Sequence, residues 1–333
     1  MVDLHLHLDG SLNPNNILVM AEMADVELPY ADEKIIRTKM MVEPDCTNLG
    51  EYLEKFDLPL QLLQTEECIE YAVYELMRDL KEQGLCYAEI RYAPQLHLKK
   101  GLTQTEVVEA TVRGRNKGIS DFGIVVNLIL CCMRGDENRD ENIETVKVAK
   151  KFLGNGVCAI DLAGNEAAYP TKSFKDVFAI AKENDVPIVI HAGEAAGADS
   201  VWHALEAGAV RIGHGIHAVE DDGLMRVLKE KKIYLEMCYS SNLQTKTVDK
   251  VEDYPLVKFI SKGLGVILNT DNLTVSGTSL KREYNLVQKQ FSLSDELLKE
   301  ISMNSVDAAF LSAEEKEKLR KRIDDEFLEW LHA

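Results

Sequence analysis

The sequence predicts an α/β fold, a (β/α)8 TIM barrel with additional helices, and three observations lead to this prediction. Short apolar runs alternate with helical stretches along most of the 333 residues, which is typical of a parallel sheet. Eight such units can be counted, and eight is the number that closes a barrel. Several runs end in histidine or acidic residues, at the edge where barrel enzymes carry their active sites.

The first half of the barrel is expected from apolar runs at residues 1–8, 86–92, 122–131 and 157–162. In the first run, Asp3, His5 and His7 alternate with apolar residues, which is the period of a strand. Asn13 and Pro14 provide a cap and a first helical position for the helix that follows. The helices of this half are expected at residues 13–24, 49–84, 103–117 and 138–153.

Residues 25–50 carry charge and prolines without a clean period, and we interpret them as an insertion over one end of the fold. In the next helix, Tyr52, Phe56, Leu60 and Leu63 fall near one face. Such a face is more often core than a binding surface. Residues 25–63 are nevertheless the candidates to cover a pocket.

The fifth strand is an apolar run within residues 186–194 that ends in His191-Ala-Gly-Glu194, where Gly193 permits a sharp turn. The later strands are expected at residues 210–213, 233–238 and 265–269. The helices of this half are expected at 171–183, 200–207, 221–230, 254–262 and, beyond the barrel, within 279–331. Because no linker, low-complexity segment or internal repeat interrupts this alternation, we expect one domain over residues 1–333.

The composition excludes several classes of partner. Lys and Arg number 38 and Asp and Glu 56, for a net charge of −18, which argues against binding nucleic acid or an anionic membrane. No apolar run approaches the roughly 18 residues of a membrane span, and no signal peptide is visible. The seven cysteines form an odd set without a Cys-x-x-Cys pair, as expected for buried thiols in a cytoplasmic protein.

Polar side chains gather at the predicted strand ends, and five of the eight histidines are among them. These residues are His5 and His7, Gly164, His191 and Glu194, His214 and His217, and Asp271 with Asn272. Strand periodicity puts His5 and His7 on one side, where two imidazoles can share a metal ion. The other histidines, His97, His203 and His332, have no such context and are expected to be surface or ordinary core residues.

Three imidazoles (His5, His7, His191) and the Asp271 carboxylate match the ligand preferences of zinc. We therefore expect one Zn²⁺ per chain, with water as a further ligand that loses its proton near neutral pH. Asp271 could both bind the metal and accept a proton from that water. A binuclear site would usually need a lysine at the end of the fourth strand, where Gly164 stands instead.

The neighbouring side chains suit proton transfer. Glu194 lies beside His191 but off its strand face, so it suits a proton carrier better than a ligand. His214 would steer or stabilise the hydroxide.

Five segments resemble those of the adenosine deaminase family, in the same order: His5-Leu-His-Leu-Asp9-Gly, Asp161-Leu-Ala-Gly164, His191-Ala-Gly-Glu194, Arg211-Ile-Gly-His214-Gly and Asn269-Thr-Asp271. The similarity spans residues 1 to about 310. These metal-dependent amidohydrolases convert adenosine and 2′-deoxyadenosine to inosine products and ammonia. By position, the resemblance implies zinc at His5, His7, His191 and Asp271, a proton from Glu194 to purine N1, and orientation of the attacking hydroxide by His214.

The resemblance also implies contacts with a purine nucleoside as the small-molecule partner. The backbone N–H of Gly164 would bind N3, Asp9 would accept from a ribose hydroxyl, and His7 would face the substrate as well as the metal. Asn272 departs from the family pattern, which often has a second aspartate whose protonated form donates to N7. An amide NH2 can donate there without a raised pKa.

Other functions remain open. Adenine and related aminopurine deaminases tend to carry His-Leu-Glu-Gly, whereas Asp9 here leaves room for a ribose. An AMP substrate would need clustered basic residues, and only Arg211 and Lys246 lie near the motifs. A non-catalytic nucleoside-binding protein would have lost a ligand or Glu194, and a metal phosphoesterase would not need the 191–194 segment. The oligomeric state is not predicted.

Overall fold

Eight parallel strands form two four-stranded sheets in the computed structural model, which describes residues 1–43, 46, 49–248 and 250–333. The strand orders are β1–β2–β3–β4 and β5–β6–β7–β8. Isolated parallel bridges continue this order across both seams, from Ile160 to Ile188 and from Leu6 to Asp271. The strands are β1 (Val2–His7), β2 (Tyr87–Tyr92), β3 (Val125–Met133), β4 (Val157–Ala163), β5 (Val189–Ala192), β6 (Arg211–His214), β7 (Tyr234–Met237) and β8 (Val266–Leu268).

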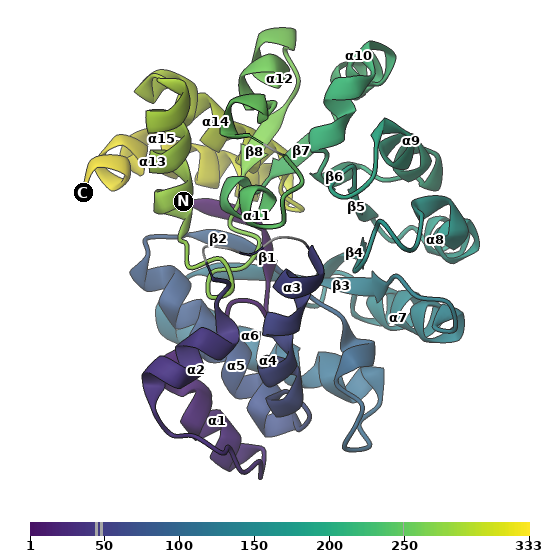
Figure 1. The fold of residues 1–333 in the computed structure, drawn as a ribbon, viewed down its shortest axis with the longest axis vertical. Coiled ribbons are helices and arrows are strands. Elements are labelled where there is room, and N and C mark those ends of the chain that lie inside the picture. The colour runs from purple at the N-terminus through teal and green to yellow at the C-terminus, as the bar shows by residue number, and fades with distance from the viewer. Residues whose placement is uncertain (44–45, 47–48, 249) are drawn as a thin grey trace.

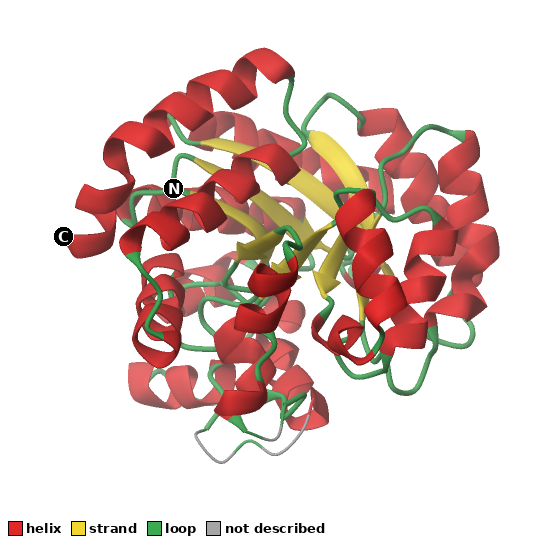
Figure 2. Ribbon diagram, turned by 90° about the horizontal axis from the view of Figure 1, so that it is seen from above, coloured by secondary structure: helices red, strands yellow, loops and turns green. Residues whose placement is uncertain are grey.

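Helices surround the strands on the outside, as Figures 1 and 2 show. Those of the first half are α1 (Ile17–Met23), α2 (Glu33–Met40), α3 (Leu49–Leu53), α4 (Asp57–Leu62), α5 (Glu66–Glu82), α6 (Gln104–Phe122) and α7 (Arg139–Phe152). Those of the second half are α8 (Lys175–Glu183), α9 (Ala198–Ala207), α10 (Asp222–Glu230), α11 (Tyr239–Gln244) and α12 (Leu256–Lys262). The additional helices are α13 (Leu280–Phe291), α14 (Asp295–Ala308) and α15 (Ala313–His332). The (β/α)8 arrangement with additional helices is confirmed.

The clearest differences from the sequence prediction lie at the end of α6 and between residues 49 and 84. The helix expected to end at residue 117 continues to Phe122. The strand expected from residue 122 begins at Val125, because α6 continues to Phe122 and ends at Gly123. Gly123 has φ = 66°, a left-handed conformation that ends helices and that glycine adopts at little cost. The helix expected over 49–84 is divided into α3, a 3₁₀ turn (Glu54–Phe56), α4 and α5.

The proposed insertion at residues 25–50 contains α2, and positions 44, 45, 47 and 48 lie outside the described residues. Ahead of it, Asn13 caps a 3₁₀ turn (Pro14–Asn16) that leads into α1, with its side chain accepting from Asn15 N at 3.1 Å. The predicted cap is therefore confirmed.

The end of α14 and the residues that follow it contact charged side chains of the barrel strands. Arg211 donates to the Ala308 main-chain oxygen (2.9 Å), and Phe310 N donates to Glu89 (2.7 Å). All seven cysteines are buried, as predicted. Among the described residues, we find no helix with the length and apolar character needed to cross a bilayer.

Candidate active site

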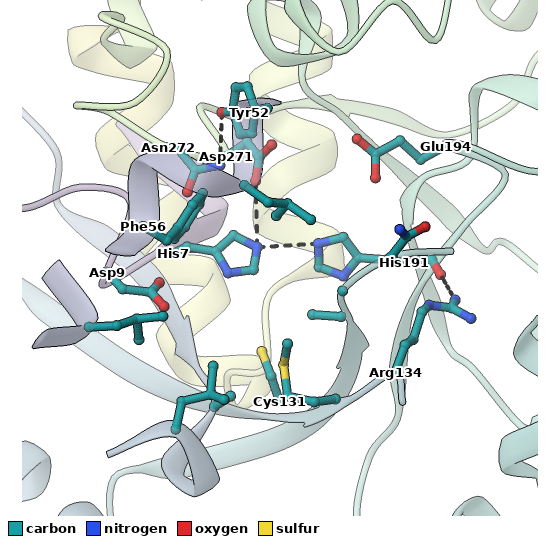
Figure 3. A pocket seen from close by; sticks show the side chains of 18 of the residues that line it. His7, Asp9, Tyr52, Phe56, Cys131, Arg134, His191, Glu194, Asp271 and Asn272 are labelled. Atoms are coloured by element: carbon teal, nitrogen blue, oxygen red, sulfur yellow. Dashed lines mark hydrogen bonds and ion pairs between the residues drawn. The ribbon is translucent and has the colours of Figure 1, made fainter. Parts of the chain in front are cut away.

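A cavity of about 280 Å³ lies at the C-terminal ends of the strands, where the sequence analysis placed the site. Figure 3 shows its lining side chains. The predicted residues His7, Asp9, Gly164, His191, Glu194, His214, Asp271 and Asn272 all line it. His5 lies in the barrel interior and is fully buried. His217 is half-buried and pairs with Glu220.

Histidines and Asp271 converge at the floor of this cavity. One ligand atom each from His5, His191, His214 and Asp271 lie within 4.8 Å of one another. His7 Nε2 lies 3.2 Å from His191 Nε2 and 3.5 Å from Asp271 Oδ1. The structure thus brings together all four predicted ligands, with His214 beside them.

The seam between β8 and β1 creates this convergence. His7 N donates to Asp271 O, and Asp271 N donates to His5 O, each at 2.8 Å. Asp271 and His214 have φ values of 62° and 59°. Non-glycine residues adopt this left-handed region at a cost of about 1–3 kcal/mol.

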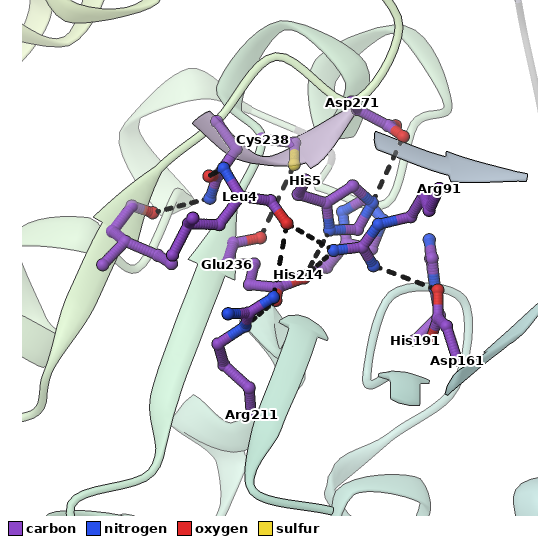
Figure 4. A network of polar contacts seen from close by, with 12 residues as sticks. Leu4, His5, Arg91, Asp161, His191, Arg211, His214, Glu236, Cys238 and Asp271 are labelled. Carbon is purple, nitrogen blue, oxygen red and sulfur yellow. Dashed lines mark hydrogen bonds and ion pairs between the residues drawn. The ribbon is translucent and has the colours of Figure 1, made fainter. Parts of the chain in front are cut away.

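Buried carboxylates fix the orientation of two imidazoles from behind, as Figure 4 shows. His5 Nδ1 lies 2.7 Å from Glu236, and His191 Nδ1 lies 2.8 Å from Asp161. Arg91 donates to both carboxylates, at 2.9 and 3.0 Å. Because Nδ1 faces a carboxylate in each ring, Nε2 of His5 is left to face Asp271 and Nε2 of His191 to face His7.

The charge state of this network follows from its pairing. Burial alone would raise the pKa of Glu236, but the guanidinium groups of Arg91 and Arg211 hold it well below its usual range. For Asp161, burial is likewise outweighed, by His191 and Arg91, so its pKa is also far below the usual range. Both carboxylates therefore stay ionised. Arg91 and Glu236 were not predicted from the sequence, although charged residues inside buried strands must be paired.

A metal ion fits these residues. His5 Nε2 is buried, makes no hydrogen bond to the described residues and lies 3.4 Å from Asp271 Oδ1. Imidazole nitrogen and carboxylate oxygen are the donors that suit zinc and related transition metals. The group formed by the histidines and Asp271 can therefore hold a metal ion.

The turn after β5 carries Glu194 and is held by Glu166. The Glu166 carboxylate accepts from the backbone nitrogens of Gly193 (2.8 Å), Glu194 (2.9 Å) and Ala195 (2.7 Å). Gly193 has φ = 68°, and a Cβ there would lie 2.6 Å from Val201 Cγ2. The predicted sharp turn at Gly193 is confirmed, whereas the role of Glu166 was not foreseen, because nothing in the sequence pairs it with a turn 28 residues away.

Glu194 is buried in the cavity wall and faces other acidic groups. Burial first, and then the carboxylates of Asp271 and Glu166, raise the pKa of Glu194 well above its usual value. His214 Nε2 lies 3.6 Å from Glu194 Oε2. A carboxyl group kept protonated in this way can donate a proton.

His214 is held from behind by Asn242, whose Nδ2 donates to His214 Nδ1 at 3.0 Å. Tyr254 donates to the amide oxygen of Asn242 (3.4 Å), which supports this orientation of the amide. Burial and the nearby His5 lower the pKa of His214 well below its usual value. In the neutral ring the proton therefore lies on Nε2, which makes His214 a donor toward the cavity rather than a ligand.

Asp9 and Gly164 lie apart from the metal-binding group. Asp9 is buried, its Oδ1 has no hydrogen-bond partner among the described residues, and burial raises its pKa to about 6. An enclosed acceptor without a partner is costly, so this oxygen suits a donor from a bound ligand. Gly164 lines the cavity with its backbone, and its φ of 102° lies in a region that glycine adopts readily.

The cavity wall opposite Glu194 comes from α3, the following turn and α4 (Figure 3). Tyr52, Leu53, Phe56 and Leu60 line it. The predicted core face is confirmed in part: Tyr52 is buried in an apolar cluster against which Phe56 packs. The same face also lines the cavity, which periodicity alone does not show. The expectation that residues 25–63 help cover the pocket is confirmed by these four residues.

Arg134 is the one arginine or lysine among the described residues that line the cavity. It donates to the main-chain oxygens of His191 and Tyr169, each at 2.6 Å, and to Thr171 (3.0 Å). Arg211, considered above for a phosphate, is instead paired with Glu89 and Glu236 in the barrel interior. This cavity therefore offers a phosphate group little basic surface.

Comparison with known proteins gives concordant results. The family model described as adenosine deaminase matches residues 1–326. An adenosine deaminase of Haemophilus ducreyi is 47% identical over 331 residues, covering 98% of this chain and 96% of that protein. The crystal structure of an adenine deaminase from Arthrobacter aurescens superposes with a TM-score of 0.88 at 27% identity, covering 100% and 99% of the two chains. That of the N6-methyl-AMP deaminase from Arabidopsis thaliana gives 0.84 at 27% identity, covering 97% and 95%.

Proposed function

Since the chain belongs to the adenosine deaminase family, we propose that it hydrolyses adenosine and 2′-deoxyadenosine to inosine and 2′-deoxyinosine with release of ammonia. The observation that carries this proposal is the position of Glu194. Its buried carboxyl group faces the cavity whose floor holds the histidines and Asp271. An acid and a metal-binding group that face one cavity suit hydrolysis of a carbon–nitrogen bond.

His5, His7, His191 and Asp271 would hold one zinc ion. A zinc ion in such a site makes water a nucleophile near neutral pH. We assign His7 rather than His214 to the ligand set, because Asn242 donates to Nδ1 of His214 and leaves the ring proton on Nε2.

Glu194 would supply the proton that a purine ring needs at N1 before C6 can be attacked. Burial and the neighbouring carboxylates raise the pKa of Glu194, which favours the protonated form that can donate. His214 would donate from Nε2 to orient the attacking water oxygen. Asp271 would accept a proton from that water. Each of these groups lines the cavity.

Two observations favour a nucleoside over the free base or the nucleotide. The unpartnered Asp9 oxygen suits a sugar hydroxyl, which adenine lacks. The cavity's arginine, Arg134, is engaged by main-chain oxygens and Thr171, so a 5′-phosphate would find no free cation beside it. The Gly164 backbone and the Asn272 amide would contact the purine edge.

We further propose that residues 1–333 act as one domain, because the site draws on strands from β1 to β8. A cytoplasmic location agrees with seven buried cysteines.

The replacement Glu194→Gln tests the assignment of the acid. The amide keeps the shape of the side chain but carries no acidic proton, so we expect kcat for adenosine to fall by about 10²–10⁴-fold. Zinc content and inosine affinity should stay near those of the wild type. The exposed Glu206→Gln on α9 serves as the matched control. Near-normal turnover in Glu194→Gln would remove Glu194 from the mechanism.

A further inference from the structure

Asn272 and Tyr52 form a hydrogen bond that joins the pocket wall to the end of the barrel. Asn272 Nδ2 donates to the Tyr52 hydroxyl at 3.0 Å, and the hydroxyl lies 2.6 Å from Ser276 Oγ. Tyr52 comes from α3 and Asn272 from the loop after β8, and both side chains are buried at the cavity. Figure 3 shows the bond between them.

The surroundings of Asn272 decide which end of its amide faces Tyr52. The amide oxygen is enclosed without a hydrogen-bond partner among the described residues, and a Cβ built on Gly10 would lie 1.7 Å from it. If the amide were reversed, an NH2 group would be enclosed there with two unmet donors instead of one unmet acceptor, which costs more. The orientation with Nδ2 toward Tyr52 is therefore favoured.

In this orientation Nδ2 gives one N–H to Tyr52 and keeps the other for a group inside the cavity. We propose that Tyr52 is a positioning residue that holds the Asn272 amide so that it presents a hydrogen-bond donor to the purine ring. This inference rests on the proposed function, in which the Asn272 amide contacts the purine edge, and it takes purine N7 as the acceptor. The orientation of the Asn272 N–H therefore depends on α3, because α3 must pack against the barrel for the Tyr52 oxygen to reach the amide.

A pair of ligands isolates this contact. Inosine carries the N7 acceptor, whereas 7-deazainosine has a C–H group in its place. Dissociation constants for both ligands would be measured by calorimetry on the wild type, Tyr52→Phe, Asn272→Leu and the double variant. The matched control is Tyr92→Phe, which removes another buried hydroxyl, bonded to Thr111 at 2.7 Å, outside the cavity lining.

We expect Tyr52→Phe to weaken inosine binding about tenfold, the order of one lost hydrogen bond, and to change 7-deazainosine binding by less than about twofold. In the Asn272→Leu background, Tyr52→Phe should have no further effect. For adenosine, Tyr52→Phe should raise KM with little change in kcat, because the contact is equal in ground and transition states. The ring that Tyr52 packs against Phe56 is kept in this variant.

Equal weakening of both ligands by Tyr52→Phe would overturn the proposal, since Tyr52 would then act only through the shape of the wall. The proposal would also be overturned if Tyr52→Phe weakened inosine binding as much in the Asn272→Leu background as it does in the wild type. Failure of the proposed function would give a different result. A wild type that binds inosine with this coupling but does not deaminate adenosine would refute the activity and leave the positioning role standing, whereas a protein that binds neither ligand would refute both.

Discussion

The floor and the wall of the pocket are stabilised by different kinds of interaction. The floor, formed by His5, His7, His191 and Asp271, rests on ionised groups that are fully buried and paired through Arg91. The wall, formed by Tyr52, Leu53, Phe56 and Leu60, is held by apolar contacts and neutral hydrogen bonds.

This difference means that substitutions in the floor and in the wall should have different costs. Removing one partner from a buried charged network leaves an uncompensated charge, which costs several kcal/mol, so the floor tolerates little change. Neutral contacts in the wall cost less to alter. We infer that the floor determines whether the reaction proceeds, whereas the wall contributes to how tightly the ligand is bound.

The largest effect is expected when the floor loses a ligand. His191→Ala should lower zinc content well below one per chain, and kcat should fall by more than the roughly 10–100-fold typical of an outer-shell partner. Metal analysis and turnover of adenosine measure the two effects. His203→Ala, on a half-buried residue of α9, is the control. Full metal stoichiometry in His191→Ala would contradict the ligand assignment.

A smaller effect is expected from the support of the acid. In the wild type, three backbone N–H groups of the turn donate to the Glu166 carboxylate. In Glu166→Gln one carboxylate oxygen is replaced by an NH2 group, which cannot accept these bonds, so the turn that carries Glu194 should shift. We expect kcat to fall about 10–100-fold with zinc content unchanged.

The same variant makes a prediction about pH. Glu166 contributes to the raised pKa of Glu194, after burial and Asp271. Removing its negative charge makes ionisation of Glu194 easier, so the alkaline limb of kcat against pH should move to lower pH. A limb that stays in place, or moves to higher pH, would contradict the electrostatic part of this account.

The last prediction concerns stability rather than turnover and involves the anchor of the wall. His97 Nδ1 donates to the Leu63 main-chain oxygen, just after α4, at 2.9 Å. Burial lowers the pKa of His97 from 6.5 to about 4. Between these values the unfolded chain binds the proton and the folded chain does not, so the free energy of unfolding falls as the pH falls from 6.5 toward 4.

This loss amounts to about 3 kcal/mol at most. Urea unfolding of the wild type and of His97→Gln between these pH values measures it, because the variant lacks this titration. His203→Gln is the control. An equal loss of stability in the wild type and His97→Gln would show that His97 does not contribute.

The sequence predicted the parts of the site that are local in the chain. His5 and His7 share a strand face, and His191 and Glu194 lie three residues apart, so spacing alone places them. Their supports come from distant strands. Arg91 reaches Asp161 and Glu236 across the barrel, and a single sequence does not show which buried charges pair.

Two other features could not be predicted from the sequence, for physical reasons. The end of α6 depends on the left-handed conformation of Gly123, whereas the apolar pattern continues through Phe122 into the strand. Tyr52 lies on a periodic apolar face, and only the folded chain brings it to Asn272, 220 residues away.

The most direct test of the proposed function is an ultraviolet assay of the zinc-loaded protein with adenosine, 2′-deoxyadenosine, adenine and AMP. We expect turnover of both nucleosides, with kcat/KM for adenine and AMP lower by at least about 100-fold. Adenine lacks the sugar that would contact Asp9, and the phosphate of AMP meets no free cation. A higher kcat/KM for adenine or AMP, or no turnover of either nucleoside, would contradict the proposed function.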